Sequence, residues 1–163
     1  MIRVYICPII GTGVKGDPYK SKGATFGYQY SNYIPSNPTT GVPTSPWSLA
    51  VLKSNDWTAI DADPTCDDLF GGDLPANIDT NEELRALLKN RTVSDVPLAR
   101  RNAIIAVLDK YGVDRSDFTG STPLWRVFQR VMRDLFGANV NEINIDFKCL
   151  LLPTTLTALM RPR

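Results

Sequence analysis

The glycine-rich segment after the first apolar run is the motif that points most directly to chemistry. Gly11, Gly13 and Gly16 form GxGxxG, the spacing of a turn that holds the pyrophosphate of a dinucleotide. Such a turn needs a helix that begins at the loop, because the helix N-terminus binds the phosphates. The residues from Asp17 onward (DPYKSK) show no helical period. We therefore interpret the segment as a turn-rich structural loop and expect no cofactor.

Five aspartates within thirteen residues raise the question of a metal site. They are Asp61, Asp63, Asp67, Asp68 and Asp73. A calcium loop counted from Asp61 would require other residue types where Thr65, Cys66 and Gly72 stand. Carboxylates at a helix start accept free backbone N–H groups and favour the helix dipole. We interpret the cluster as helix-capping residues and expect no metal.

The usual nucleophile and base pairs are missing from the chain. It contains no histidine, which removes the commonest general base and the commonest zinc ligand. Cys7, Cys66 and Cys149 are widely spaced and form no CxxC, so we expect reduced thiols and no disulfide framework. Because the sequence shows no catalytic constellation, we expect that the protein is not an enzyme; the alternative is a nucleotide-binding enzyme that uses the glycine-rich segment.

A run of arginines is the strongest charge feature. Lys and Arg number 18 and Asp and Glu number 17, a net charge of +1, so no global charge attracts nucleic acid or a membrane. Arg126, Arg130 and Arg133 nevertheless fall at i, i+4 and i+7, on one face of an expected helix. The face could be solvated surface, a protein interface or a phosphate contact. We place the protein interface above nucleic acid because arginine is enriched at interfaces.

The elements that must position these groups change type along the chain. The pattern predicts strands at 2–10, 24–34, 47–53 and 56–60, a helical turn at 63–70, helices at 81–90, from 94 or 95 to 111, and 122–137, and a strand at 143–151. This order gives an α+β fold: N-terminal antiparallel β-strands, three to four helices and one returning C-terminal strand. We expect one domain over residues 1–152.

The segment 35–46 contains four prolines, which oppose regular structure and favour an extended arm or a long loop. Tyr33 and Trp47 bracket this segment and are candidates for contact with a partner. We expect the arm to reach a neighbouring subunit.

The tail 153–163 shows no clear period and keeps Leu156 and Met160 as apolar anchors. We expect this tail to be a second arm that binds a neighbour. The alternative is a short helix over 154–160 that packs on its own domain. Deleting the tail separates the two, because only a packed helix would lower the stability of the monomer when removed.

Several runs together resemble a group of small proteins encoded by tailed phages and prophages. The runs are ICPIIGTGVKGDPYKSK, IPSN, PWSLAVLKSNDWTAIDADP, LDKYGVDRSDF and LWRVFQRVMRDLFG. The chain departs from the group at 35–46 and after residue 152, and no catalytic activity is associated with the group. The resemblance implies a virion structural component, made in the host cytoplasm, at the capsid surface, the head-to-tail region or the tail. Its partners would then be other virion proteins in an oligomeric assembly, with no membrane involved.

Overall fold

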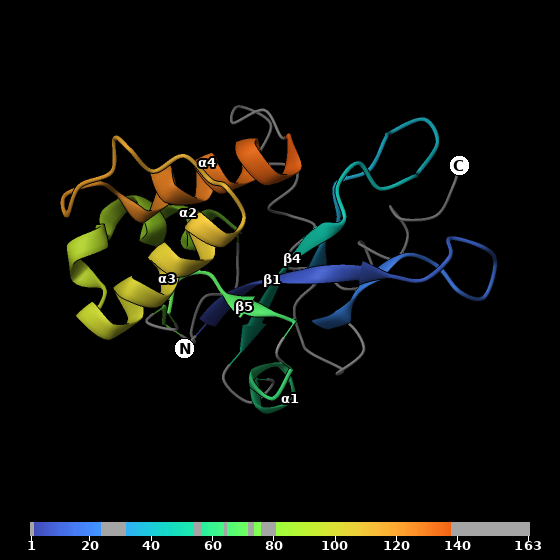
Figure 1. The fold of residues 1–163 in the computed structure, drawn as a ribbon, viewed down its shortest axis with the longest axis horizontal. Helices are drawn as coiled ribbons and strands as arrows, with labels where there is room; N and C mark the ends of the chain where they lie inside the picture. The colour runs from blue at the N-terminus through green and yellow to red at the C-terminus, as the bar shows by residue number, and fades with distance from the viewer. Residues whose placement is uncertain are drawn as a thin grey trace.

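The protein has an α+β fold in which a sheet from the N-terminal half is followed by helices from the second half (Figure 1). The computed structural model describes residues 2–23, 32–53, 57–63, 65–71, 74–75 and 81–137. The strands are β1 (Ile2–Ile10), β2 (Lys20–Ser21), β3 (Asn32–Tyr33), β4 (Trp47–Lys53) and β5 (Asp67–Asp68). The helices are α1 (Trp57–Asp61), α2 (Asn81–Asn90), α3 (Leu98–Lys110) and α4 (Leu124–Phe136), with a 3₁₀ turn η3 (Val93–Asp95).

Strand β1 is the centre of the sheet. The strand order is β2-β1-β4-β3, β5 also pairs with β1, and all these pairs are antiparallel. The longest ladder joins β1 to β4, from Ile2 opposite Lys53 to Pro8 opposite Trp47. The N–H of Ile9 donates to the carbonyl of Pro46 at 3.0 Å. The backbone nitrogen of the preceding residue, Pro8, therefore points away from β4. Its missing N–H therefore breaks no bond of this ladder.

Alternation along β1 and β4 gives the sheet two buried faces. The first face packs against α2, α3 and α4 and carries Ile2, Val4, Ile6, Leu49 and Val51. The second face is covered by α1 and carries Tyr5, Cys7, Ala50 and Leu52, with Ile60 and Cys66 packed on them. In an antiparallel sheet successive side chains point to opposite faces. Burial on both faces explains why β1 is apolar at nearly every position.

Helix α4 matches the sequence prediction closely. The structure begins it after Pro123 and ends it at Gly137, whose φ of 64° is left-handed. Gly137 donates its N–H to the carbonyl of Arg133 at 3.1 Å, a C-terminal cap that glycine adopts without strain. The apolar stripe of α4 is buried in the first-face core and includes Leu124, Phe128 and Val131. Helix α2 covers the predicted range 81–90.

Three short elements differ from the sequence predictions. The strand expected at 56–60 is wrong, because residues 57–61 form α1; the indole of Trp57 donates to the carbonyl of Leu52 at 3.3 Å, and Ile60 is buried on the second face. The helical turn expected at 63–70 is also wrong, because β5 runs through it. The third helix begins at Leu98 and not near residue 95, since η3 precedes it.

Candidate interaction surfaces

The glycine loop of residues 11–19 closes on itself as a tight turn. The N–H groups of Thr12 and Gly13 donate to the carbonyl of Asp17 at 3.3 and 3.0 Å, and the N–H of Asp17 donates to the carbonyl of Val14 at 2.9 Å. The hydroxyl of Thr12 also donates to the carboxylate of Asp17 at 3.1 Å. The loop is thus braced by its own hydrogen bonds, as the interpretation of a turn-rich structural loop requires.

Close approach within this loop explains two of its glycines. A Cβ at Gly11 would lie 2.3 Å from the carbonyl oxygen of Pro18, and a Cβ at Gly13 would lie 2.4 Å from the ring of Tyr19. Both glycines also have left-handed φ angles, 100° and 74°. A side chain at either position would therefore collide with the loop itself. Strand β2, and not a helix, begins directly after it at Lys20.

The proline-rich segment 35–46 is also a closed hairpin, which is the long loop of the two expected alternatives and not an extended arm. The N–H of Asn37 donates to the carbonyl of Val42 at 2.8 Å, and the N–H of Thr44 donates to the carbonyl of Pro35 at 2.9 Å. The side-chain oxygen of Asn37 accepts the N–H of Thr39 at 2.8 Å. The prolines stand where no ladder bond needs their N–H, so they restrict the backbone without preventing the fold-back.

The two loops project from the end of the sheet opposite α2, α3 and α4 (Figure 1) and flank an open groove. We call residues 11–19, residues 35–46 and this groove the hairpin end. The groove has a volume of about 380 Å³ and is lined by Ile9, Gly11, Tyr19, Val42, Pro43, Thr44, Ser45 and Pro46. Val14 and Val42, in the two loops, are 61% and 50% exposed. The hairpin end therefore offers apolar surface on braced loops.

Sequence reasoning missed Val14 and Val42 as surface residues. Turns are usually filled by Gly, Pro, Asn, Asp and Ser, so a valine inside the turns GTGVKGD and TTGVP is the signal that could have found them. Both valines are exposed in the described part of the chain and are available for contact with another molecule.

Tyr33 and Trp47, expected to contact a partner, also pack against other residues of this chain, and their contact with a partner stays a prediction. The ring of Tyr33 meets Phe136 of α4 edge-on, with centroids 6.1 Å apart, and Trp47 meets Tyr111 at 4.6 Å. Both residues are partly buried against the first-face core. Their role is to join the sheet to α4 and to the end of α3.

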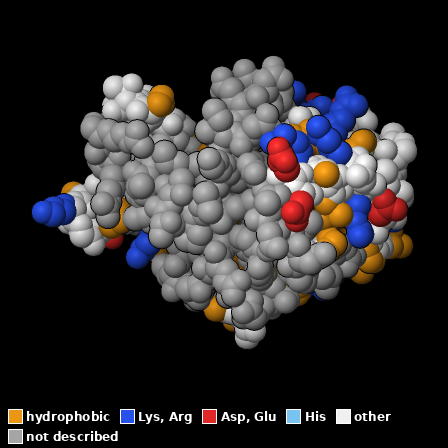
Figure 2. Space-filling model, turned by 180° about the vertical axis from the view of Figure 1, so that it is seen from behind, with side chains coloured by type: hydrophobic (Ala, Val, Ile, Leu, Met, Phe, Trp, Pro, Cys, Tyr) orange, Lys and Arg blue, Asp and Glu red, His pale blue; other side chains and the backbone are white. Residues whose placement is uncertain are grey.

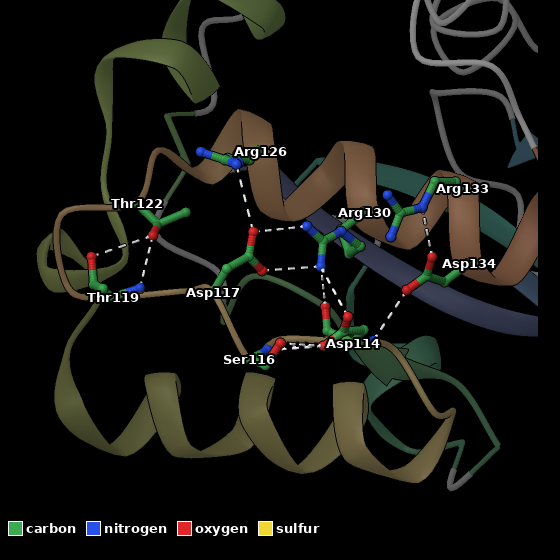
Figure 3. A network of polar contacts seen from close by, with 9 residues as sticks. All are labelled: Asp114, Ser116, Asp117, Thr119, Thr122, Arg126, Arg130, Arg133 and Asp134. Carbon is green, nitrogen blue, oxygen red and sulfur yellow. Dashed lines mark hydrogen bonds and ion pairs between the residues drawn. The ribbon is translucent and has the colours of Figure 1, made fainter.

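Arg130 of α4 is a brace for the loop that connects α3 to α4 (Figure 3). Its guanidinium group donates to the carbonyl of Asp114 at 2.7 Å and to both carboxylate oxygens of Asp117 at 3.1 and 3.0 Å. The side chain is only 12% exposed and lies over the ring of Phe118. The Arg130 hydrogen bond also lowers the pKa of Asp117 below its usual range.

The two other arginines of this face are each paired with a carboxylate. Arg133 donates to Asp134 at 2.9 Å, and Arg126 lies 3.5 Å from Asp117. Their side chains are 56% and 62% exposed. Basic and acidic side chains lie next to each other over the helical end of the molecule when it is seen from behind (Figure 2). The face therefore carries mixed charge and not a continuous positive stripe.

Asp61 and Asp68 flank Arg3 on the second face of the sheet. Asp61 accepts hydrogen bonds from the guanidinium group of Arg3 at 2.6 Å and from the hydroxyl of Tyr5 at 2.6 Å. Asp68 lies 3.4 Å from Arg3. Burial raises the pKa of Asp68 to about 6, although Arg3 and two backbone N–H groups act in the opposite direction. Arg3 also lies over the ring of Trp57 at 4.0 Å.

The other described aspartates of the acidic cluster bind neighbouring protein groups. Asp63 accepts the N–H and the hydroxyl of Thr65 at 3.0 and 2.7 Å. Asp67 accepts the hydroxyl of Tyr111 at 2.7 Å and the ammonium group of Lys110 at 3.2 Å. The expected role as helix caps is wrong, since these residues lie in a turn and a strand. Within the ranges that the structure describes, no three such side chains are grouped as a metal site.

An apolar pocket of about 220 Å³ lies between α3, α4 and their connecting loop. Its walls include Ile104, Leu108 and Val127, and Arg101 and Arg115 also line it. Arg115 is engaged by Asp109 at 2.7 Å. The pocket could hold an apolar side chain, and Thr119 supplies the hydroxyl group of its lining.

No family model, no curated protein and no solved structure matches the chain.

Several predictions lie outside the described residues. They concern the expected contact residues Leu156 and Met160, Asp73 of the acidic cluster, the strand expected at 143–151 and most of the strand expected at 24–34. In the described part, no helix has the length and apolar character needed to cross a membrane. The function is therefore inferred from the hairpin end and the arginine face of α4.

Proposed function

We propose that the protein is a non-enzymatic structural component of a phage particle that acts through contacts with other virion proteins. The hairpin end carries this proposal. Two loops with exposed valines, Val14 and Val42, flank one open groove. Because internal hydrogen bonds already fix both loops, little conformational entropy remains to be lost when a partner binds.

The resemblance to phage proteins involves the same surface. The run from Gly11 to Tyr19 (GTGVKGDPY) is the part of the chain that resembles the glycine loop of that group. The contacts around Gly11, Gly13 and Asp17 give each of these residues a role in the shape of the loop. This supports an assembly role at the capsid surface, the head-to-tail region or the tail, for a protein made in the host cytoplasm.

Nucleic-acid binding through Arg126, Arg130 and Arg133 is not favoured by a specific observation. Each guanidinium group already lies beside a carboxylate. Phosphate binding by Arg130 would have to displace Asp117 and the carbonyl of Asp114. We therefore retain protein contacts as the proposed function.

The test replaces both exposed valines in the phage genome, as Val14→Asp together with Val42→Asp. We expect the amount of protein in purified virions to fall at least tenfold, with the Tm of the isolated protein unchanged. Leu98→Asp is the matched control, because Leu98 is 65% exposed and lies on α3, away from the hairpin end. Absence of the wild-type protein from purified virions would overturn the proposal, as would a nucleotide retained in native mass spectrometry.

A further inference from the structure

Two buried cysteines lie at neighbouring parts of the sheet, Cys7 in β1 and Cys66 immediately before β5. Strands β1 and β5 are antiparallel, with Tyr5 opposite Asp68 and Ile6 opposite Asp67. One step further in the same register places Cys7 opposite Cys66. Cys7 is fully buried and Cys66 is 7% exposed, and both belong to the apolar cluster of the second face. The sequence separates these residues widely, and only the pairing of β5 brings them together.

The position in the ladder suits a covalent link. Opposite residues of an antiparallel pair alternate between hydrogen-bonded and non-hydrogen-bonded positions. Leu69 donates its N–H to the carbonyl of Val4, so the position of Val4 is hydrogen-bonded and that of Cys7 is not. Side chains at non-hydrogen-bonded positions are the closer ones, with Cα atoms about 4.5 Å apart. That separation lies within the range of about 4.4–6.8 Å that disulfides use.

The thiol of Cys66 affects the ionisation of the Cys7 thiol in the reduced protein. A hydrogen bond with Cys66, together with burial, raises the pKa of the Cys7 thiol. Both residues are free thiols in the structure. A sulfur–sulfur hydrogen bond requires neighbouring Sγ atoms, which agrees with the register.

We propose that Cys7 and Cys66 form an oxidation site that closes as a cross-strand disulfide with a small disulfide oxidant such as oxidised glutathione. Cys66, which retains some exposure, attacks a sulfur of the oxidant as its thiolate and releases one reduced glutathione. The Cys7 thiolate then attacks the Cys66 sulfur of the mixed disulfide and releases the second. The protein loses two protons and two electrons, and the oxidant becomes two thiols. The new bond joins β5 covalently to β1.

The test incubates the full chain in buffers of graded reduced and oxidised glutathione, then blocks the remaining thiols with an alkylating reagent and digests with trypsin. Each cysteine falls in its own peptide, because basic cleavage sites separate Cys7, Cys66 and Cys149. We expect a linked pair that joins residues 4–15 to residues 54–85, lighter by two hydrogen atoms than the sum of its parts. We also expect a higher Tm for the oxidised protein than for the reduced one, because the bond restricts the unfolded chain.

Two variants sharpen the result. Cys149→Ser should form the same link, and Cys7→Ser should form none and show no rise in Tm on oxidation. A link to Cys149, or glutathione retained on Cys66, would overturn the proposal. Incubation with oxidised glutathione at the midpoint of thermal unfolding also exposes the two buried sulfurs to the oxidant. If Cys7 and Cys66 are both still alkylated after that incubation, the proposal is overturned as well. The comparison of oxidised and reduced wild-type protein stands even if Cys7→Ser does not fold.

Discussion

Arg130 holds the loop before α4 in place, and its replacement should lower stability. Arg130→Met keeps an unbranched aliphatic side chain and removes the hydrogen bonds to Asp117 and to the carbonyl of Asp114, together with the guanidinium group over Phe118. Hydrogen bonds with charged partners in a nearly buried position contribute on the order of 1–3 kcal/mol. We expect the free energy of unfolding to fall by about 1–2 kcal/mol in urea titrations.

The matched control for this change is Arg133→Met on the same helix. Arg133 is 56% exposed and bonds only its neighbour Asp134 among the contacts that the structure describes. Exposed ion pairs contribute little, so the expected loss is below about 0.5 kcal/mol. Equal losses for the two variants would show that Arg130 is an ordinary surface residue.

Asp68 should make stability depend on pH in an unusual direction. Burial raises its pKa to about 6, against about 3.9 in the unfolded chain. The folded protein therefore binds this proton more tightly than the unfolded chain does. Its contribution to stability is fully present below about pH 4 and is lost as the pH rises through about 6.

The variant Asp68→Asn tests this dependence because an amide oxygen can still accept the N–H groups of Phe70 and Gly71. Free energies of unfolding are measured for both proteins between about pH 4 and pH 7. The wild type should lose about 1–3 kcal/mol relative to the variant over that range. Parallel curves would contradict the raised pKa.

The arginine face shows what residue spacing can and cannot predict. The spacing of i, i+4 and i+7 correctly predicts that Arg126, Arg130 and Arg133 lie along one helix, α4. An α-helix has about 3.6 residues per turn, so residues at this spacing share one face. Their partners could not be predicted, since Asp114 and Asp117 come from a loop whose path depends on tertiary packing. The spacing of the arginines therefore does not reveal that this surface carries mixed charge.

At the scale of elements, the glycine loop owes its shape to contacts that leave no room for a side chain. Gly11→Ala would place a Cβ 2.3 Å from the carbonyl oxygen of Pro18, whereas nothing lies within 4 Å of a Cβ at Gly16. Both glycines have a left-handed φ, 100° and 92°, so the intrinsic strain of alanine is similar at the two positions. The difference in stability between the two variants therefore measures the cost of the contact between the added Cβ at Gly11 and the carbonyl oxygen of Pro18.

We expect Gly16→Ala to lower the free energy of unfolding by about 1 kcal/mol and Gly11→Ala by about 2–3 kcal/mol. Thermal or urea unfolding of the two variants measures both values. If Gly11→Ala also changes the loop, it should reduce incorporation into virions when Gly16→Ala does not. Equal destabilisation would mean that the loop relaxes around Gly11 without cost.

The long elements could be predicted from sequence and the short ones could not. Strands β1 and β4 and helices α2 and α4 carry enough apolar residues for their period to be recognised. Helix α1 and strand β5 are five and two residues long, so their conformation follows from the neighbours they pack on. The misassigned β5 also concealed the pairing of Cys7 with Cys66, because that pairing exists only in the register of β5 with β1.

At the scale of the whole molecule, balanced charge predicts weak and salt-insensitive contact with nucleic acid. The net charge is +1, and the arginines of α4 are neutralised in place. Each phosphate contact would add to the slope of affinity against salt concentration. We expect labelled duplex DNA to show no saturable binding, and Arg126→Glu to change nothing. Tight binding with a steep salt slope that this substitution reduces would restore the nucleic-acid interpretation.

The central position of β1 has a consequence for how the chain folds during synthesis. β1 is made before every strand that it pairs with, and its longest ladder requires β4, in which Lys53 lies opposite Ile2. Bringing two distant segments together lowers the entropy of the chain before the stabilising contacts between them form. Folding is slow for this reason. Until β4 leaves the ribosome, most of this apolar strand stays unpaired, because β2 pairs only with Ile9 and Ile10. Nascent chains with unpaired apolar strands associate wrongly. Early residues of this protein are therefore the ones that a chaperone would need to shield.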